Sequence, residues 1–145
     1  VSEYVARFIG TPSTNMLPAS VEAGDAGPEI VGKGYRIPAP ADQFENRVGE
    51  SVTLGIRPQY LDPEVGAHRI DVTVGVVEQL GTEFVVHGET ADGTPVDVVA
   101  EGVGDAETDD TLSVGFDAAD AFVFDADGDT ICHGDALVAA SSALQ

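Results

Sequence analysis

The sequence predicts an all-β domain, because apolar and polar residues alternate along short segments that turn residues separate. The alternating segments span residues 52–57, 70–76, 84–87, 96–98, 112–116 and 122–124. A period of two is typical of strands that bury one face and expose the other. Asp92-Gly93 stands between two such segments, and Asp-Gly pairs favour the tight turn of a β-hairpin. Asp127-Gly128, after the last segment, is predicted to be a second turn of this kind.

Helical signals are few and short. Residues 3–9 have room for one or two turns, residues 58–61 could form a single turn after a strand, and residues 136–145 favour a loose tail or a short helix. The stretches 38–42 and 102–110 are poor in apolar side chains, so we expect solvated loops there. A small number of short strands favours a small OB-like barrel with short helical turns. No internal repeat is predicted.

Charge is the most unusual property of the composition. There are 26 Asp and Glu against 6 Lys and Arg, a formal net charge of −20, yet 43% of the residues are hydrophobic. Disordered acidic chains lack such an apolar fraction, so we expect a folded domain covered with carboxylates. Molar salt screens repulsion within such a surface. The charge therefore predicts a halophilic source, and it argues against nucleic acid as a partner.

Two segments resemble ligand-binding loops only in part. Residues 27–34 have the spacing of a phosphate-binding loop up to Lys33, but Gly34 stands where Ser or Thr is needed and no helix pattern follows. We expect a turn between two short strands there. Residues 125–129 resemble the start of a calcium loop without its later glycine and glutamate. We expect no metal or cofactor site in either segment.

Other reactive side chains are scattered along the chain. His68, His87 and His133 lack a second histidine at metal-ligand spacing, so we expect structural roles for them. The single cysteine, Cys132, fits a reducing compartment such as the cytoplasm. No nucleophile, base and oxyanion donor can be assembled from the sequence, so no catalytic residue is predicted and we expect this chain not to be an enzyme by itself.

Four segments, taken in order, resemble one family. They are FIGTPSTNML at 8–17, LGIRPQYL at 54–61, VEQLGTE at 77–83 and FDAADAFVFD at 116–125. Together they resemble the C-terminal part of the ATP-binding subunits of maltose-type and glycerol-phosphate-type ABC importers, which carries a transport-associated OB (TOBE) domain. The sequence departs from that pattern at Thr14, at Gln59-Tyr60 and at Phe122, where the family usually has Met, Glu-His and His.

The resemblance implies a division of the chain into three parts. Residues 1–9 would be the exit helix of a preceding ATPase domain, residues 10–134 the TOBE/OB-like domain, and residues 135–145 a C-terminal tail. ATP and Mg would bind in the ATPase domain, outside this chain. The implied partners are a second copy in a homodimer, the ATPase domain and the membrane permease subunits. The implied location is the cytoplasmic face of the cell membrane, and the implied source is a halophilic archaeon.

Seven residues carry the family motif or a possible interface. Gly10 and Pro12 would shape the entry into the first strand, and Gly81 would allow the tight turn after residue 80. Arg57 is one of the few cations, so we expect it to pair with a carboxylate, at a subunit junction or inside the fold. The full set is Gly10, Pro12, Asn15, Arg57, Pro58, Glu78 and Gly81.

Three functions from different classes remain open at this point. The first is a regulatory and dimerisation module of a transporter ATPase. The second is an OB module that senses a small ligand, either an oxyanion or a sugar phosphate, although a net charge of −20 disfavours anions unless arginines or backbone amides line the pocket. The third is a free-standing hydrolase.

Overall fold

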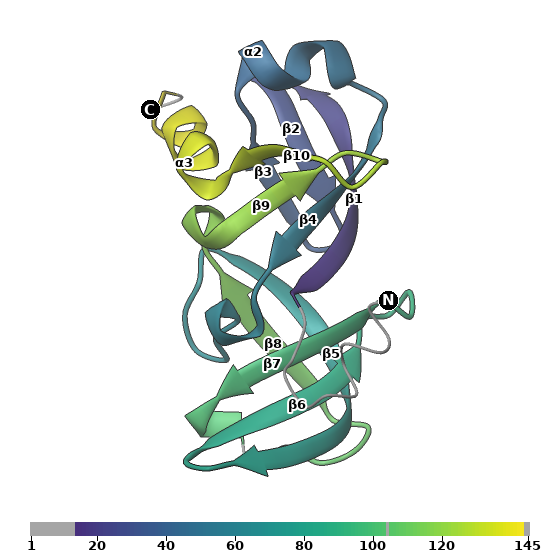
Figure 1. Cartoon of the computed structure of the whole chain (residues 1–145), viewed down its shortest axis with the longest axis vertical. Helices are drawn as coiled ribbons and strands as arrows, with labels where there is room; N and C mark the ends of the chain where they lie inside the picture. The colour runs from purple at the N-terminus through teal and green to yellow at the C-terminus, as the bar shows by residue number, and fades with distance from the viewer. Residues whose placement is uncertain (1–13, 104, 144–145) are drawn as a thin grey trace.

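The computed structural model describes residues 14–103 and 105–143, and the side chains of residues 102 and 141–143 are not described. The predicted helix 1–9 and the motif residues Gly10 and Pro12 lie outside these residues. The described residues form two curled antiparallel sheets with a few short helices (Figure 1), so the predicted all-β class and OB-like architecture are confirmed.

The larger sheet has six strands in the order β10-β9-β4-β1-β2-β3. It is built from both ends of the described chain. The strands are β1 (Asn15–Gly24), β2 (Gly27–Gly32), β3 (Tyr35–Pro38), β4 (Ser51–Ile56), β9 (Ala121–Phe124) and β10 (Thr130–His133). The inner face buries alternate residues such as Leu17, Ile30 and Leu54, which is the pattern that period-two alternation predicts.

The smaller sheet has four strands in the order β7-β6-β5-β8. It consists of β5 (His68–Leu80), β6 (Glu83–Glu89), β7 (Pro95–Ala100) and β8 (Thr111–Phe116). The hairpin predicted at Asp92-Gly93 joins β6 to β7, and the one predicted at Asp127-Gly128 joins β9 to β10. Gly93 and Gly128 both have positive φ, which glycine adopts without strain.

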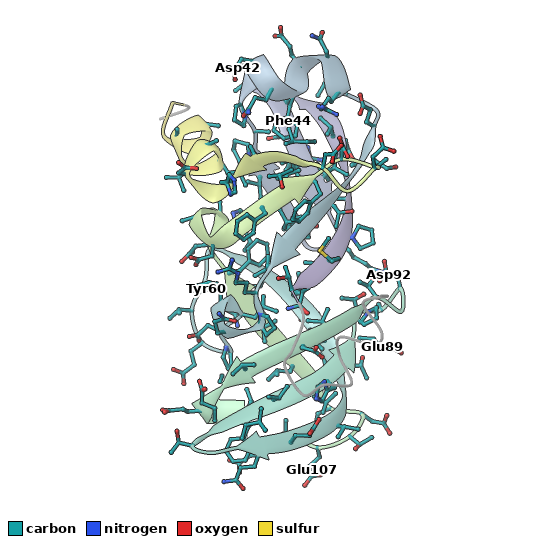
Figure 2. All side chains as sticks on the ribbon, in the orientation of Figure 1. Asp42, Phe44, Tyr60, Glu89, Asp92 and Glu107 are labelled. Carbon is teal, nitrogen blue, oxygen red and sulfur yellow. The ribbon has the colours of Figure 1, made fainter. Side chains whose placement is uncertain are left out.

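The two sheets share one hydrophobic core. Tyr35 on β3 meets Phe116 on β8 edge to face, with ring centroids 5.6 Å apart, so the aromatic contact joins the sheets. Other fully buried side chains come from distant parts of the sequence, including Phe44 and Leu137. Figure 2 shows Phe44 beneath the short helix at one end of the molecule, whereas Asp42, Glu89 and Glu107 lie on the outside.

The strand β5 departs from simple alternation at Gly75. The register with β6 shifts between Val74 and Val76, so one extra residue forms a β-bulge. Val74 is 1% exposed and Val76 is 58% exposed, although the alternation places both on one face. A Cβ atom at position 75 would lie 2.9 Å from the carbonyl oxygen of His87, which explains glycine at the bulge.

Two stretches predicted as solvated loops are partly ordered and buried. Residues 38–42 run into the helix α2 (Ala41–Phe44) and the 3₁₀ turn η1 (Glu45–Arg47), and Ala39 is buried. In the second stretch, the 3₁₀ turn η3 (Glu101–Val103) buries Val103. In each stretch one apolar side chain, Ala39 or Val103, is buried in the core. The composition of a mostly polar segment does not show that such a residue will be buried.

The C-terminal stretch is a helix. α3 (Gly134–Ala143) follows β10 directly and places Leu137 fully in the core. Of the two alternatives for residues 136–145, the short helix is the one the structure has over its described part. The proposed boundary at residue 134 stays a prediction.

Two units of the fold each consist of a strand followed by a 3₁₀ turn, although no internal repeat was predicted from the sequence. β4 leads into the 3₁₀ turn η2 (Pro58–Tyr60), as predicted for 58–61, and β8 leads into η4 (Ala118–Asp120). Each strand ends on a buried apolar-Gly-apolar triplet centred on Gly55 or Gly115. The two units resemble one another in their burial pattern and secondary structure more than in their amino-acid sequence.

Candidate functional site

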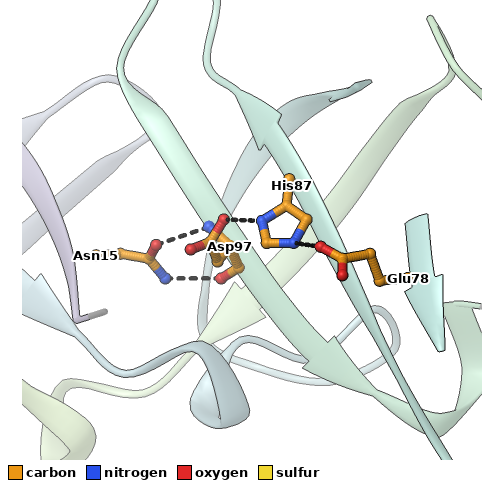
Figure 3. Close-up of polar contacts among 4 residues, drawn as sticks. All are labelled: Asn15, Glu78, His87 and Asp97. Atoms are coloured by element: carbon orange, nitrogen blue, oxygen red, sulfur yellow. Dashed lines mark hydrogen bonds and ion pairs between the residues drawn. The ribbon is translucent and has the colours of Figure 1, made fainter. Parts of the chain in front are cut away.

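A chain of hydrogen bonds links Asn15, Asp97, His87 and Glu78 (Figure 3). The Asn15 side chain donates from Nδ2 to the carbonyl oxygen of Asp97 at 2.8 Å, and its Oδ1 accepts from the Asp97 backbone N–H at 2.7 Å. Asn15 lies on β1 and Asp97 on β7. The Asn15 side-chain amide makes the two backbone hydrogen bonds that a neighbouring strand would otherwise make with Asp97. It ties one sheet to the other across 82 residues of sequence.

His87 bridges two carboxylates. Its Nδ1 lies 2.8 Å from Asp97 Oδ1 and its Nε2 lies 2.6 Å from Glu78 Oε1. Asp97 is 1% exposed, and a buried carboxylate needs such a partner. The network is therefore a structural clamp, in agreement with the structural role expected for His87.

Two of the motif residues, Asn15 and Glu78, thus meet through residues that the sequence analysis did not select. Asp97 was expected to lie opposite the buried Val96 and Val98, but all three are buried, because Asn15 on β1 covers the other face of β7. The pairing of His87 with Asp97 could have been predicted from the hairpin at Asp92-Gly93, because the register of that hairpin places the two residues directly opposite one another.

Arg57 and Pro58 follow β4 directly. Pro58 ends the strand and starts η2, as predicted. Arg57 forms no ion pair with any carboxylate among the described residues, so the alternative of a pair inside the fold is not found there, and the alternative of a pair at a subunit junction stays a prediction. Its guanidinium lies 5.4 Å from the ring centroid of Phe122, where a cation–π interaction replaces the ion pair.

A surface groove of about 570 Å³ begins at Arg57. Its wall is largely apolar, and the β5–β6 turn forms one end. The lining residues are Thr14, Arg57, Pro58, Gln59, Leu80, Glu83 and Val99. Gly81, with φ 64°, lies in the two-residue turn between Leu80 and Glu83, which confirms the turn predicted there. Arg57 and Glu83 give the groove one charge of each sign.

The two loop-like segments form turns. Lys33-Gly34 joins β2 to β3, and Gly34 has φ 93°, so the predicted turn between two short strands is confirmed. In the β9–β10 turn the Asp125 Oδ1 accepts hydrogen bonds from the backbone N–H groups of Asp127 and Asp129. Within the described residues, no group of three or more His, Cys, Asp or Glu side chains is placed to hold a metal.

Two buried acids have raised pKa values. Burial, with a smaller contribution from Asp135, raises the pKa of the Cys132 thiol to about 11. Burial and the nearby Asp92 carboxylate also raise the pKa of Tyr35. Cys132 and His133 point to opposite faces of β10, as expected, since one is buried and the other exposed. A thiol that stays protonated is a poor nucleophile or metal ligand.

None of the helices within residues 14–143 that the structure describes has the length and apolar content needed to cross a bilayer.

Comparison with known proteins identifies the two halves of the fold. Residues 10–61 match the family model of the MalK OB fold domain, and residues 54–124 match that of the TOBE domain. The sn-glycerol-3-phosphate import ATP-binding protein UgpC of Cereibacter sphaeroides is 39% identical over 127 residues, which are 86% of this chain and 33% of that protein. The maltose/maltodextrin import ATP-binding protein MalK of Vibrio cholerae is 33% identical over 132 residues, 88% of this chain and 35% of that protein.

A solved structure supports the fold. The cytoplasmic molybdate-binding protein ModG, with molybdate bound, superposes with a TM-score of 0.59 and 17% identity, over 75% of this chain and 94% of ModG. This likeness shows the fold alone. The chain spans about a third of the length of the two curated relatives. On the two matched models and these relatives, the chain belongs to the TOBE and MalK OB-fold family of domains found in importer ATP-binding proteins.

Proposed function

We propose that this chain is the C-terminal regulatory and dimerisation domain of the ATP-binding subunit of a sugar-type ABC importer. One observation carries the proposal: the two family models follow one another along this chain, and the relatives that contain the same region are named as import ATP-binding proteins. The substrate would be a sugar or a glycerol phosphate, and its selection would lie in other subunits.

In this proposal the chain does no chemistry of its own. ATP and Mg would be bound by the rest of the subunit, and the permease subunits would be met through that part at the cytoplasmic face of the membrane. The contribution of this chain would be mechanical. Asn15 ties β1, the first described strand, to β7 of the other sheet, so a movement entering through β1 would be passed to both sheets together.

Reading the gene that encodes this chain tests the proposal most directly. We expect a Walker A motif, an ABC signature and a Walker B motif upstream of the codon for Val1. An upstream region that encodes a different kind of protein would remove the ATPase assignment. The ATPase activity of the full-length product, with and without this domain, would then measure the regulatory effect.

Sensing of a small ligand is the second candidate function. The likeness to ModG favours it at the level of fold, because ModG is a molybdate-binding protein. Calorimetry with molybdate, glycerol 3-phosphate and maltose in molar KCl would test it. Heat of binding from one of them, lost on Arg57→Gln, would assign the ligand to the groove beside η2. Absence of binding by all three would favour the regulatory function alone.

A further inference from the structure

The hydroxyl group of Tyr35 is a buried donor that forms no hydrogen bond with any of the described residues. Tyr35 lies on β3 and is 7% exposed. Its ring is held from two sides, because it meets Phe116 edge to face and because a side chain at Gly32 would overlap its hydroxyl end. Buried polar groups without a partner are destabilising and rare in folded proteins, so this fixed hydroxyl needs a partner where it stands.

A small pocket lies beside this ring, between one turn of each sheet. The β2–β3 turn belongs to the larger sheet and the β6–β7 turn to the smaller one. Lys33 and Tyr35 line the pocket from the first turn, and Thr90, Asp92 and Thr94 line it from the second. Apolar side chains of β1 and β5 form the rest of its wall. The pocket is therefore a polar meeting point of the two sheets.

The β6–β7 turn offers hydrogen-bond acceptors at this pocket. Asp92 Oδ1 accepts hydrogen bonds from the Thr90 hydroxyl, from the Thr94 hydroxyl at 3.0 Å and from the Thr94 backbone N–H at 3.3 Å. The bond from Thr90, followed by those from Thr94, lowers the pKa of Asp92, so this group is a carboxylate. Both threonine protons are committed to Oδ1, which leaves Asp92 Oδ2 and the lone pairs of the two hydroxyl oxygens as acceptors.

Tyr35 supplies the donor. Burial, with a smaller contribution from the Asp92 carboxylate, raises the pKa of Tyr35, so its hydroxyl keeps the proton. The charge of Asp92 thus acts on the hydroxyl, although no direct hydrogen bond joins these two described residues. A donor and a group of acceptors that line one pocket without touching can be joined by a single oxygen atom that both accepts and donates.

The size of the pocket limits the molecule that can carry this oxygen. Its volume is about 20 Å³. A buried water needs roughly 10–15 Å³ of such space and two to four polar partners. The pocket therefore has room for one water molecule, with Tyr35 and the oxygens of the β6–β7 turn as its partners.

We propose that this pocket binds one ordered water, which accepts from the Tyr35 hydroxyl and donates to the acceptors of the Asp92 turn. The water joins the larger sheet to the smaller one. The Asn15 clamp ties β1 to β7, and this water ties β3 to the turn that leads into β7, so the same strand is held at two points. The inference does not depend on the transporter assignment.

The variant Tyr35→Phe tests the water by the sign of its effect. It removes the hydroxyl and keeps the ring. With the water bound, hydrogen bonds are lost, and the folding equilibrium constant measured by urea unfolding in molar KCl should fall about fivefold. With an unpartnered hydroxyl, the same change removes a buried polar group and should raise the constant. Tyr60→Phe, at a tyrosine that is 42% exposed, is the matched control and should leave the constant unchanged.

A double-mutant cycle tests whether the water reaches the Asp92 turn. Asp92→Ala removes the carboxylate and also weakens the turn, but the effect on the turn is common to both backgrounds and cancels in the cycle. The loss from Tyr35→Phe should be about fivefold in the wild type and about twofold or less in the Asp92→Ala background. Equal losses in the two backgrounds would mean that the hydroxyl is satisfied elsewhere.

A crystal structure of the wild-type chain locates the bound oxygen. We expect one density peak within about 3.2 Å of Tyr35 Oη and of an oxygen of Thr90, Asp92 or Thr94. Replacing KCl with RbCl distinguishes water from a monovalent cation, because rubidium scatters anomalously. An anomalous peak in the pocket, a Tyr35 hydroxyl bonded directly to a protein group, or a folding constant that rises in Tyr35→Phe would overturn the inference.

Discussion

The ring of Phe124 occupies the space that a side chain at Gly55 would need. A Cβ atom at position 55 would lie 2.7 Å from Cε2 of that ring, well inside van der Waals contact. Gly55 on β4 and Phe124 on β9 belong to adjacent strands of the larger sheet. The glycine therefore leaves room for the ring of Phe124 over β4.

Gly55→Ala should destabilise the domain by about 1 kcal/mol, because the partly exposed ring of Phe124 must move away from β4 to admit the methyl group. Chemical denaturation in molar KCl measures this free energy of unfolding. The double variant Gly55→Ala/Phe124→Leu removes the clashing ring edge, so its loss should be smaller than the sum of the two single losses. A Gly55→Ala protein as stable as the wild type would contradict this interpretation.

Asn15→Leu should cost about 2–4 kcal/mol of unfolding free energy, because it leaves the backbone N–H and C=O of buried Asp97 without the Asn15 amide. Leucine keeps the branched shape of asparagine and is larger, so the loss does not come from a cavity. Urea unfolding measures the change. Ser20→Ala, on the same strand but not in the clamp, is the control and should change stability by less than about 0.5 kcal/mol. Equal losses for both variants would argue against the clamp.

His68 should make stability depend on pH. Burial lowers the pKa of His68 from 6.5, and Asp117 offsets this in part. The unfolded chain therefore binds the proton more readily than the folded one. The contribution of this group is present above pH 6.5 and is lost as the pH falls below that value.

The variant His68→Phe isolates this contribution. The ring of His68 packs on Phe116 with centroids 5.4 Å apart, and phenylalanine retains a ring that does not titrate. The wild type should lose stability relative to His68→Phe as the pH is lowered from about 8 to about 5, which denaturation at several pH values measures. A difference that stays constant with pH would show that His68 does not titrate in this way.

The acidic surface should make the fold depend on salt. We infer a salt-adapted protein from the net charge of −20, because molar salt shortens the Debye length to about 3 Å and removes most of the repulsion. The melting temperature should rise steeply between low and molar KCl, and any dimer should strengthen over the same range. A sorbitol series at low ionic strength separates screening from preferential exclusion. Equal stabilisation by sorbitol would mean that charge repulsion is not the cause.

Much of the strand pattern could be predicted from local alternation and turn residues, because both act over a few residues. β5, β6 and the Asp92-Gly93 turn are examples. The exposed Val76 could not be predicted, since a bulge of one residue reverses the alternation after Gly75. The burial of Phe44 and Leu137 depends on gaps left by distant strands, which no local pattern contains.

The candidate site was predicted less completely than the fold. Asn15 and Glu78 were selected from the resemblance, but their connection through His87 and Asp97 needs the register of three strands and the approach of β1. Arg57 was assigned an acidic partner because it is one of few cations in an acidic chain, whereas within the described residues its guanidinium lies over the ring of Phe122. Composition gives the number of acidic residues in the chain, but the pairing of β4 with β9 decides which side chain lies beside Arg57.

The larger sheet has consequences for synthesis on the ribosome. Its central strand β4 pairs with β1, which emerges early, and with β9, whose residues emerge after the whole smaller sheet. Until residue 124 has left the exit tunnel, one edge of β4 stays open to pairing with other nascent chains. A chain stopped after β8 should therefore aggregate instead of accumulating as a stable half-domain, and folding should wait for the last third of the chain.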